Sequence, residues 1–316
     1  MTAIPTLVPP SSAVLSQPYV TPAMFTAYPT WLDLDNLIPG GVAALQEDVL
    51  ADSLLAATDW AVGVVEDMPL HAHWVQNENR PAYLKGSGRA VVRPESIPVR
   101  ALTSLSWGAD PEAMTPVSLP DASMRFEGDG RRMSWRPGGG IGQFTGPALQ
   151  FGPRAVVPGQ LFVTWSYVAG FPSTTLSASC AASASSVTVA DPAGILPGDV
   201  LRIFDPGQTE ALTVASTYVP SLPTVPATPT SIPLAAPTAN PHIAGTGITG
   251  MPRKILQAVI AYTVALLMRD DVSADEPASA FGPAARTTDS PNAGKAGGLV
   301  NDARGWLSAY KPTLRS

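Results

Sequence analysis

The sequence predicts an α+β protein built on a small helical bundle that is discontinuous along the chain. Two apolar helical segments, residues 46–66 and 252–269, lie far apart in the sequence, and neither has an apolar helical partner nearby. The residues between them show short apolar runs broken by proline and glycine, a pattern typical of strands and turns. The economical arrangement packs the two helices together and leaves the β structure as an insertion.

Composition supports a globular chain with many turns. Of 316 residues, 45% are apolar, which is enough for a sizeable core, and 14% are charged, against roughly a quarter in ordinary soluble domains. The 34 prolines and 27 glycines indicate turns, arms and extended segments that gain order against neighbours. A formal net charge of −6 disfavours a surface built to bind nucleic-acid phosphates.

Sequence signals for disulfides, export and membrane insertion are absent. Cys180 is the single cysteine, which rules out intrachain disulfides and makes thiolate metal clusters unexpected. Residues 1–20 have neither a basic segment nor a continuous apolar stretch, so an ordinary secretory signal is not expected. The most apolar window, residues 255–268, is shorter than the roughly 20 residues needed to cross a bilayer. We expect a protein made without export and without a membrane partner.

The N-terminal third is predicted to contain an arm and two helices. Prolines throughout residues 1–25 predict an extended arm. A short helix is expected near 30–37, with Thr30 as its cap. The helix over 46–66 carries two apolar stripes and is therefore expected to be buried on two sides. Residues 26–80 together with 251–269 are assigned to a helical core domain.

Two β regions are predicted between the long helices. Residues 81–175 form the first, a β excursion in which "EGDG" signals a hairpin between Met124 and Trp135. Residues 176–250 form the second, an inserted β module whose short strands are separated by "DPAG", "LPGD" and "DPGQ" turns. The later part of this module, residues 219–245, holds too many prolines for a central strand and suits an edge excursion.

Helical structure is predicted to return after the second β region. Pro252 is a favoured first-turn residue, and the apolar residues that follow predict a helix covered all round. Residues 270–316 are assigned to a C-terminal arm that ends in an amphipathic helix over 297–309. The part of this arm before the helix is rich in Ala, Ser, Pro, Gly and acidic residues, so we expect it to gain order only against a partner.

Several features occur in a fixed order along the chain. They are the "QEDVLADSLLAATDWAVGVVE" helix, a "P-V-x-x-L-x-S-L" run at 98–105, a "Y-x-x-G-F-P" strand end at 167–172, and a helix opening on Met251, Pro252, Ile255 and Ala258. The order of these elements resembles the head-tail connector, or adaptor, proteins of long-tailed bacteriophages, and the resemblance covers most of residues 26–310. The inserted module carries "PGD" at 197–199, Glu210, His242 and Gly245. With these features, residues 186–250 are similar to a β module seen in phage virion proteins.

The resemblance implies a structural virion protein, made in the host cytoplasm and located in the neck at the head-tail interface. Such proteins form a homo-oligomeric ring, usually of twelve copies, under the portal protein, and they present a docking surface to the next neck or tail protein, a stopper or tail terminator. Double-stranded DNA passes through the ring without specific binding. Weakly charged walls let DNA slide, because cationic side chains would hold its phosphates.

There are three alternatives, and two of them belong to other functional classes. A carbohydrate- or receptor-binding virion module would use the inserted β region, but residues 186–250 hold only Phe204 and Tyr218 as aromatic side chains. Another neck or tail completion protein would share the structural role. A hydrolase ranks below both, since no nucleophile elbow occurs in the sequence.

Candidate partner-binding residues lie in two places. Trp306, Leu307 and Tyr310 form an aromatic and apolar stripe that suits either a docking anchor or packing within the domain. Arg131 and Arg132 suit either contact with an acidic partner or DNA, or a solvated hairpin tip.

No catalytic, cofactor-binding or metal-binding residue is predicted, and no cofactor is expected. His71 and His73 suit a metal site only with a third ligand that the sequence does not supply. The glycine-rich residues 136–146 lack the spacing of a phosphate loop and suit a loop tip. Asp33–Asn36 suit a helix cap better than a calcium loop. Glu210 and His242 suit a salt link or turn hydrogen bond better than an acid-base pair.

Overall fold

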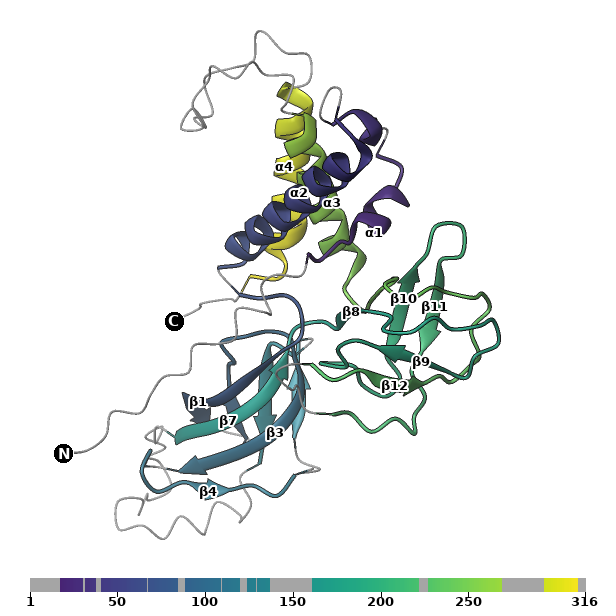
Figure 1. Ribbon diagram of the computed structural model, residues 1–316. Coiled ribbons are helices and arrows are strands. Elements are labelled where there is room, and N and C mark those ends of the chain that lie inside the picture. Colours follow the sequence, from purple (N-terminus) through teal and green to yellow (C-terminus); the bar gives the residue numbers. More distant parts are fainter. Residues whose placement is uncertain are drawn as a thin grey trace, which may run out of the picture. The chain divides into compact units, whose positions relative to one another are not determined.

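The computed structural model describes residues 18–30, 32–37, 41–66, 68–84, 89–108, 110–119, 124–128, 130–136, 161–221, 227–268 and 293–311. These residues form helices and antiparallel sheets, which confirms the α+β class (Figure 1). They fold as two compact units. One unit comprises described residues of Met1–Pro69 and Pro172–Lys311, and the other comprises those of Leu70–Phe171.

The first unit contains the helices and the inserted β module. Helix α2 (Ala43–Val64) and helix α3 (Arg253–Leu267) lie side by side and are joined by α4 (Ala293–Ser308), which packs against α3 (Figure 1). Two shorter elements precede them, α1 (Pro22–Thr26) and a 3₁₀ turn, η2 (Leu34–Asn36). The predicted pairing of two helices far apart in the sequence is therefore confirmed.

Helix α3 is covered almost all round, as the apolar pattern predicts. Its buried side chains include Ile255, Val259 and Thr263, and the Thr263 hydroxyl donates to the Val259 carbonyl at 2.9 Å. Helix α2 differs from the prediction, because it buries a single stripe that runs through Leu50, Leu54, Ala57 and Ala61. The second predicted stripe of α2, which includes Trp60, is half-buried or exposed.

The start of the described chain packs on the bundle and is not an arm. Tyr19 and Val20 are buried, and the Tyr19 N–H donates to the Thr58 hydroxyl of α2 at 3.1 Å. Thr21 caps α1 by accepting from the Met24 N–H, and Pro22 occupies the first turn, where its missing N–H costs nothing. The extended arm predicted for residues 1–25 is therefore wrong from residue 18 onward, and its earlier part lies outside the described residues.

The helix predicted near residues 30–37 is reduced to the 3₁₀ turn η2 in the described part of this segment. Asp33, not Thr30, is the cap, since its carboxylate accepts from the Asp35 N–H at 3.2 Å. Pro39 follows shortly afterwards and disfavours helical backbone in the residue before it. The predicted cap function of the Asp33–Asn36 segment is confirmed.

The β module is built from two small antiparallel sheets around one apolar core. One sheet has the order β11-β10-β13-β8, and the other pairs β12 with β9. Gly247 of β13 lies against the Thr21 and Met24 side chains of the α1 segment, so the module and the bundle touch there. The strands are β8 (Ser173–Thr175), β9 (Ser186–Val189), β10 (Val200–Phe204), β11 (Glu210–Thr213), β12 (Thr230–Pro233) and β13 (Gly247–Thr249).

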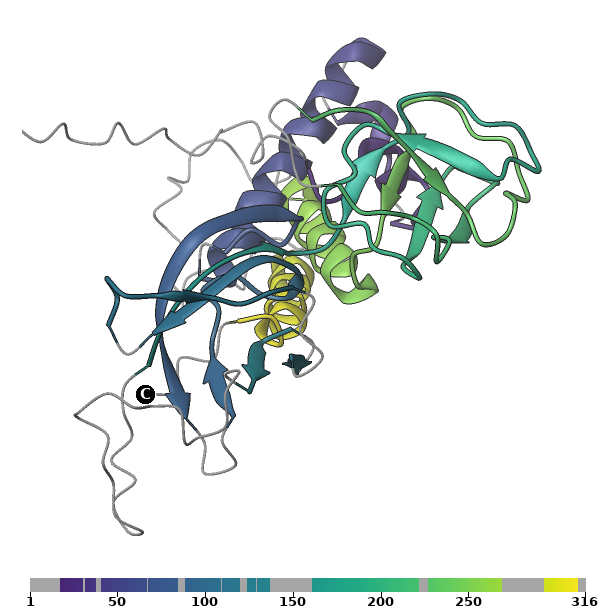
Figure 2. The ribbon, with the colours of Figure 1, turned by 90° about the horizontal axis from the view of Figure 1, so that it is seen from below.

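The second unit is a curled antiparallel sheet with the order β4-β3-β7-β1-β2-β6-β5. Figure 2 shows the strongly bent course of β1, which pairs with β7 on one side and β2 on the other. The predicted hairpin around "EGDG" is confirmed, with Phe126 opposite Met133. The strands are β1 (His73–Leu84), β2 (Ala90–Val92), β3 (Val99–Gly108), β4 (Thr115–Pro116), β5 (Arg125–Glu127), β6 (Arg132–Trp135) and β7 (Leu161–Ala169).

Strand β1 begins at His73, inside the range 26–80 that the sequence assigned to the helical core. Its polar residues hide the strand pattern, but its backbone is paired with β7 from His73 to Ala82. A bulge between Val75 and Glu78 interrupts this pairing and places Asn77 at φ 50°. Such a bulge breaks the two-residue alternation by which strands are found in sequence.

Candidate functional site

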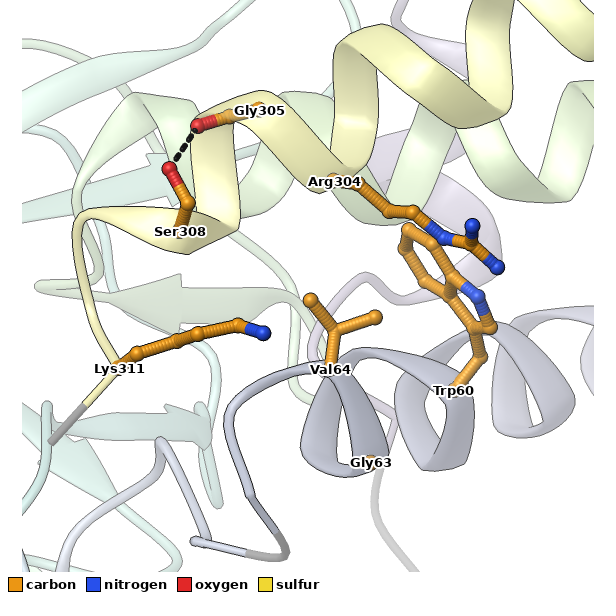
Figure 3. A pocket seen from close by; sticks show the side chains of 7 residues that line it. All are labelled: Trp60, Gly63, Val64, Arg304, Gly305, Ser308 and Lys311. Carbon is orange, nitrogen blue, oxygen red and sulfur yellow. Dashed lines mark hydrogen bonds between the residues drawn. The ribbon is translucent and has the colours of Figure 1, made fainter.

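A pocket of about 690 Å³ opens between α2 and α4 in the helical unit (Figure 3). This volume lies within the roughly 300–1,000 Å³ range of small-molecule sites. Helix α2 supplies one wall, and α4 with the turn that follows it supplies the other. The lining residues are Trp60, Gly63 and Val64 on the first wall and Arg304, Gly305, Ser308 and Lys311 on the second.

Helical spacing explains why these residues face the pocket. Arg304, Ser308 and Lys311 are spaced four and three residues apart, so they lie along one face of α4 and its final turn. The backbone N–H of Lys311 donates to the Ser308 carbonyl at 3.3 Å, which continues this face beyond the end of the helix. Trp60 and Val64 are one turn apart on α2 and form the opposing apolar surface.

Two glycines keep the pocket open. A Cβ atom added at Gly63 or Gly305 would meet no other atom within 4 Å, so neither glycine is required by close packing. Glycine inside a helix costs about 1 kcal/mol relative to alanine. The two walls therefore leave an unfilled space above these positions.

The pocket is basic, although the chain as a whole is acidic. Arg304 and Lys311 are both exposed, and the described residues of the lining include no carboxylate. Within the described residues, neither cation forms an ion pair. Figure 3 shows the Arg304 side chain extending alongside the Trp60 ring and the Lys311 side chain extending toward Val64. The arrangement places two cations over an aromatic and apolar floor, which is formed by Trp60 and Val64 of α2.

Trp60 is held in place by an aromatic neighbour on α3. Its ring stacks on Tyr262 of α3, with ring centroids 4.0 Å apart and planes 6° from parallel. A stacked ring on a helix loses little further conformational freedom when a partner binds, so this wall is preorganised.

The predicted stripe Trp306, Leu307 and Tyr310 lies on α4 and the turn after it but does not line this pocket. Leu307 is fully buried and contributes to the bundle, whereas Trp306 and Tyr310 are half-buried. Of the two interpretations that the sequence allows for the stripe, packing within the domain therefore describes Leu307. The basic face of α4 was missed by sequence reasoning, although the Arg304 to Lys311 spacing was a readable signal for it.

The other predicted partner-binding residues, Arg131 and Arg132, lie in the second unit at the β5–β6 hairpin. Arg132 is exposed and stands opposite Glu127 in the strand register. Arg131 is half-buried, and its N–H donates to the Gly128 carbonyl within the turn. The structure places these two residues at the hairpin tip that the sequence indicates.

Glu210 and His242 meet in the β module, with a third residue that the sequence did not suggest. His242 Nε2 lies 2.6 Å from Glu210 Oε1, and Nδ1 lies 3.1 Å from Asp205 Oδ2. The imidazole is fully buried, and the Glu210 carboxylate also accepts from the N–H groups of Ala239 and Asn240. Burial alone would raise the pKa of Glu210, but the hydrogen bonds from Ala239, His242 and Asn240 outweigh burial and lower it. The cluster ties the β10–β11 hairpin to the 239–242 loop, which supports the salt-link interpretation.

A second buried carboxylate, Glu78, anchors the curled sheet. It accepts a short hydrogen bond from the Tyr167 hydroxyl, and its other oxygen lies 2.6 Å from Arg80 Nε. Arg80 also pairs with Glu95 at 2.7 Å, and these contacts raise the Arg80 pKa through the Glu78 hydrogen bond above all. Burial and the adjacent Glu78 charge raise the pKa of Tyr167 far above its ordinary value. Every partner here lies on this one sheet or its loops, so the cluster stabilises the folded sheet and does not form a binding site.

The remaining chemical candidates do not assemble into a site. His73 Nδ1 bonds the His71 carbonyl at 2.9 Å, and burial lowers the pKa of His73. Across the described ranges, no three His, Cys, Asp or Glu side chains gather in a way that suits a metal ion. Residues 137–146 of the glycine-rich segment lie outside the described residues.

The chain matches no protein-family model, no curated protein and no solved structure. No helix in the described parts of the chain combines the length and apolar character needed to cross a bilayer.

Proposed function

We propose that this protein is a structural adaptor of a bacteriophage neck, without enzymatic activity or cofactor. In this proposal, about twelve copies form a ring between the portal protein and a stopper or tail-terminator protein. Each copy contacts the next through the same head-to-tail interface, which generates a closed ring. Double-stranded DNA passes through the ring, and the protein belongs to the virion after synthesis in the host cytoplasm.

The observation that carries the proposal is the pairing of α2 with α3. Trp60 stacks on Tyr262, and the entire curled sheet together with the β module lies between these two helices in the sequence. The resemblance to adaptor proteins rests on this order of a helix, β insertions and a second helix in the chain. A bundle closed by residues on both sides of long insertions leaves those insertions free to reach neighbouring molecules.

Charge supports the proposed passage of DNA. The chain carries 19 Lys and Arg against 25 Asp and Glu, so a ring of such subunits would be acidic overall. An acidic wall repels the phosphate backbone and does not trap it. We expect the lumen of the ring to be poor in lysine and arginine.

The proposal is tested by imaging the purified full chain by negative-stain electron microscopy, alone and with the portal protein of the same virus. A coaxial ring on the portal is expected. Free chain that stays monomeric but forms a ring on the portal also agrees with the proposal. Failure to associate with the portal or with any other neck protein would contradict it.

The alternative of a carbohydrate- or receptor-binding module gains no support from the β module. Tyr218 is buried at 6% exposure and Phe204 is half-buried, so the module's two aromatic side chains do not form an exposed platform. Sugar sites depend on accessible aromatic faces and convergent polar groups. Glycan-array binding by the purified chain would reverse this ranking.

A further inference from the structure

We propose that the pocket between α2 and α4 binds the acidic segment 270–276 of a neighbouring copy of this chain. The inference rests on the proposed ring, and it names the contact that joins one subunit to the next. It starts from the two cations of the pocket, Arg304 and Lys311, which point over the Trp60 and Val64 surface (Figure 3).

The charge of the pocket is complementary to a negatively charged partner. Arg304 and Lys311 lie on one face of α4 and its final turn. The described residues of the lining include no carboxylate, and no described carboxylate pairs with either cation. Arg304 and Lys311 are seven residues apart, about two helical turns, so a ligand that meets both must extend along the helix. Arginine in particular binds carboxylates through two parallel hydrogen bonds.

The floor of the pocket suits a peptide that has small side chains between its charged residues. Trp60 and Val64 present apolar surface, and the bare backbones of Gly63 and Gly305 leave room for a peptide to lie close to both helices. A ligand that was only an ion would leave this apolar floor uncovered. An extended acidic peptide covers it and reaches both cations.

The sequence supplies such a peptide. Residues 270–276 read "DDVSADE", with four carboxylates among Val, Ser and Ala, and they lie outside the described residues. They begin three residues after the end of α3 in the chain, and α3 packs against the same α4 that forms one wall of the pocket. Their charge and their small side chains match the cations and the floor.

A neighbouring copy is the occupant because a ring needs two different surfaces that bind each other. In such a head-to-tail contact, each subunit presents a donor surface on one side and an acceptor surface on the other. The acidic segment is the donor and the α2–α4 pocket is the acceptor. Attraction between opposite charges also makes this contact sensitive to salt.

The first experiment measures segment binding without requiring a ring. The receptor is the full chain in which the segment is neutralised by Asp270→Asn, Asp271→Asn, Asp275→Asn and Glu276→Gln, so that it does not compete with the probe. The probe is a fluorescein-labelled peptide of residues 270–279, followed by fluorescence anisotropy. Adding Arg304→Glu and Lys311→Glu to the receptor should weaken binding at least tenfold, and equal binding would overturn the inference.

Two further receptors separate the pocket from general charge. Gly305→Leu fills the open space without changing charge and should also weaken binding about tenfold. Gly298→Leu on the same helix is the matched control, since a Cβ there likewise meets no atom within 4 Å but Gly298 does not line the pocket. Equal effects of these two substitutions would contradict a specific pocket.

The second experiment asks which chain donates the segment. Particle mass is measured by mass photometry, with portal present if the free chain is monomeric. The pocket variant (Arg304→Glu, Lys311→Glu) and a segment variant (Asp270→Lys, Asp271→Lys, Asp275→Lys, Glu276→Lys) should each fail to form the ring alone. Mixed together, they should form it, because the reversed pocket of one chain fits the reversed segment of the other.

The outcomes separate the inference from the function on which it rests. Rings formed by each variant alone would overturn the inference and leave the adaptor proposal standing. Recovery only when both reversals are placed in one chain would assign the contact to a single subunit and overturn it as well. If the unaltered chain forms no assembly with any neck protein, the adaptor proposal fails, while the peptide measurement still reports on the pocket.

Discussion

Trp60 of α2 and Tyr262 of α3 stack with their ring centroids 4.0 Å apart and their planes 6° from parallel. The contact joins two helices that are separated in the chain by a seven-stranded sheet and the β module. It therefore joins the part of the bundle that precedes both insertions in the chain to the part that follows them. The same indole also lines the basic pocket, so one residue serves both the fold and the proposed contact.

The effects of substituting Trp60 and Tyr262 on the free energy of unfolding should not be additive, because the two rings stabilise each other. Aromatic pairs contribute about 0.5–1.5 kcal/mol beyond the area that they bury. A double-mutant cycle with Trp60→Leu and Tyr262→Leu, followed by chemical denaturation of the helical unit, should give a coupling free energy in this range. Trp74→Leu combined with Tyr262→Leu is the control, because Trp74 belongs to the other unit, and their effects should add. Additive effects for the stacked pair would contradict the prediction.

The Glu210 cluster should make the β module sensitive to acid. The folded-state pKa of Glu210 is lowered, so this group stabilises the folded module above its unfolded pKa of about 4.3, and the contribution is lost as pH falls further. Hydrogen exchange at the Ala239 and Asn240 amides, which donate to Glu210, should accelerate over this range relative to amides elsewhere in the module.

Glu210→Gln tests the cause of that acid sensitivity. The amide still accepts a hydrogen bond but carries no charge for His242, so exchange at Ala239 and Asn240 should already be faster at neutral pH and should change less on acidification. Asp191→Asn is a control in the same module, because the Asp191 carboxylate accepts from Ala193 and takes no part in the His242 cluster. An unchanged acid response in Glu210→Gln would show that other carboxylates dominate.

Tyr167 should remain protonated when exposed tyrosines ionise. Its pKa is raised by burial and by Glu78, so the folded state holds this proton while the unfolded state releases it near pH 10, and stability falls as pH rises past that value. The chain contains seven tyrosines. In a 295 nm titration of folded protein, Tyr167→Phe should leave the step near pH 10 unchanged, whereas Tyr83→Phe, at a side chain 66% exposed, should reduce it by one tyrosine. A smaller step in Tyr167→Phe would contradict the buried hydrogen-bonded phenol.

Two glycines should respond to alanine in opposite directions. Gly170 has φ +89°, and a Cβ there would lie 2.2 Å from the His71 carbonyl oxygen, so Gly170→Ala should destabilise the sheet by about 2 kcal/mol or more. Gly298 lies inside α4 with open space around it, so Gly298→Ala should stabilise the helix by about 0.5–1 kcal/mol. Thermal unfolding of both variants measures these effects. A stable Gly170→Ala protein would show that the His71–Gly170 approach relaxes.

The local signals in the sequence were sufficient for most elements. The apolar repeat after Pro252 predicted α3 and its burial, and the "EGDG" turn predicted the β5–β6 hairpin. The same signals failed where the local pattern did not match the element that forms. The bulge at Asn77 and the polar side chains of β1 hid a strand that its ladder with β7 stabilises. Thr21 and Pro22 were a readable helix start, but the surrounding prolines outweighed them in the prediction.

The candidate sites were less accessible to sequence reasoning. Glu210 and His242 were paired correctly, whereas Asp205, which holds the second nitrogen of the same imidazole, was not suspected. The Glu78 cluster joins β1, β7 and the loop at Glu95 and Ser96, and no short motif links those segments. Residues that meet through tertiary folding leave no periodic trace in the sequence.

The sequence by itself determined the α+β class, the two apolar helices that must find each other, and the acidic character of the chain, because these depend on composition and on periodicity within one segment. Only the tertiary structure decided that Trp60 meets Tyr262, that His242 lies between two carboxylates, and that Arg304 and Lys311 face an open space over α2. Each of those relationships joins segments that are distant in the chain. Their free energy comes from the way in which complete elements pack.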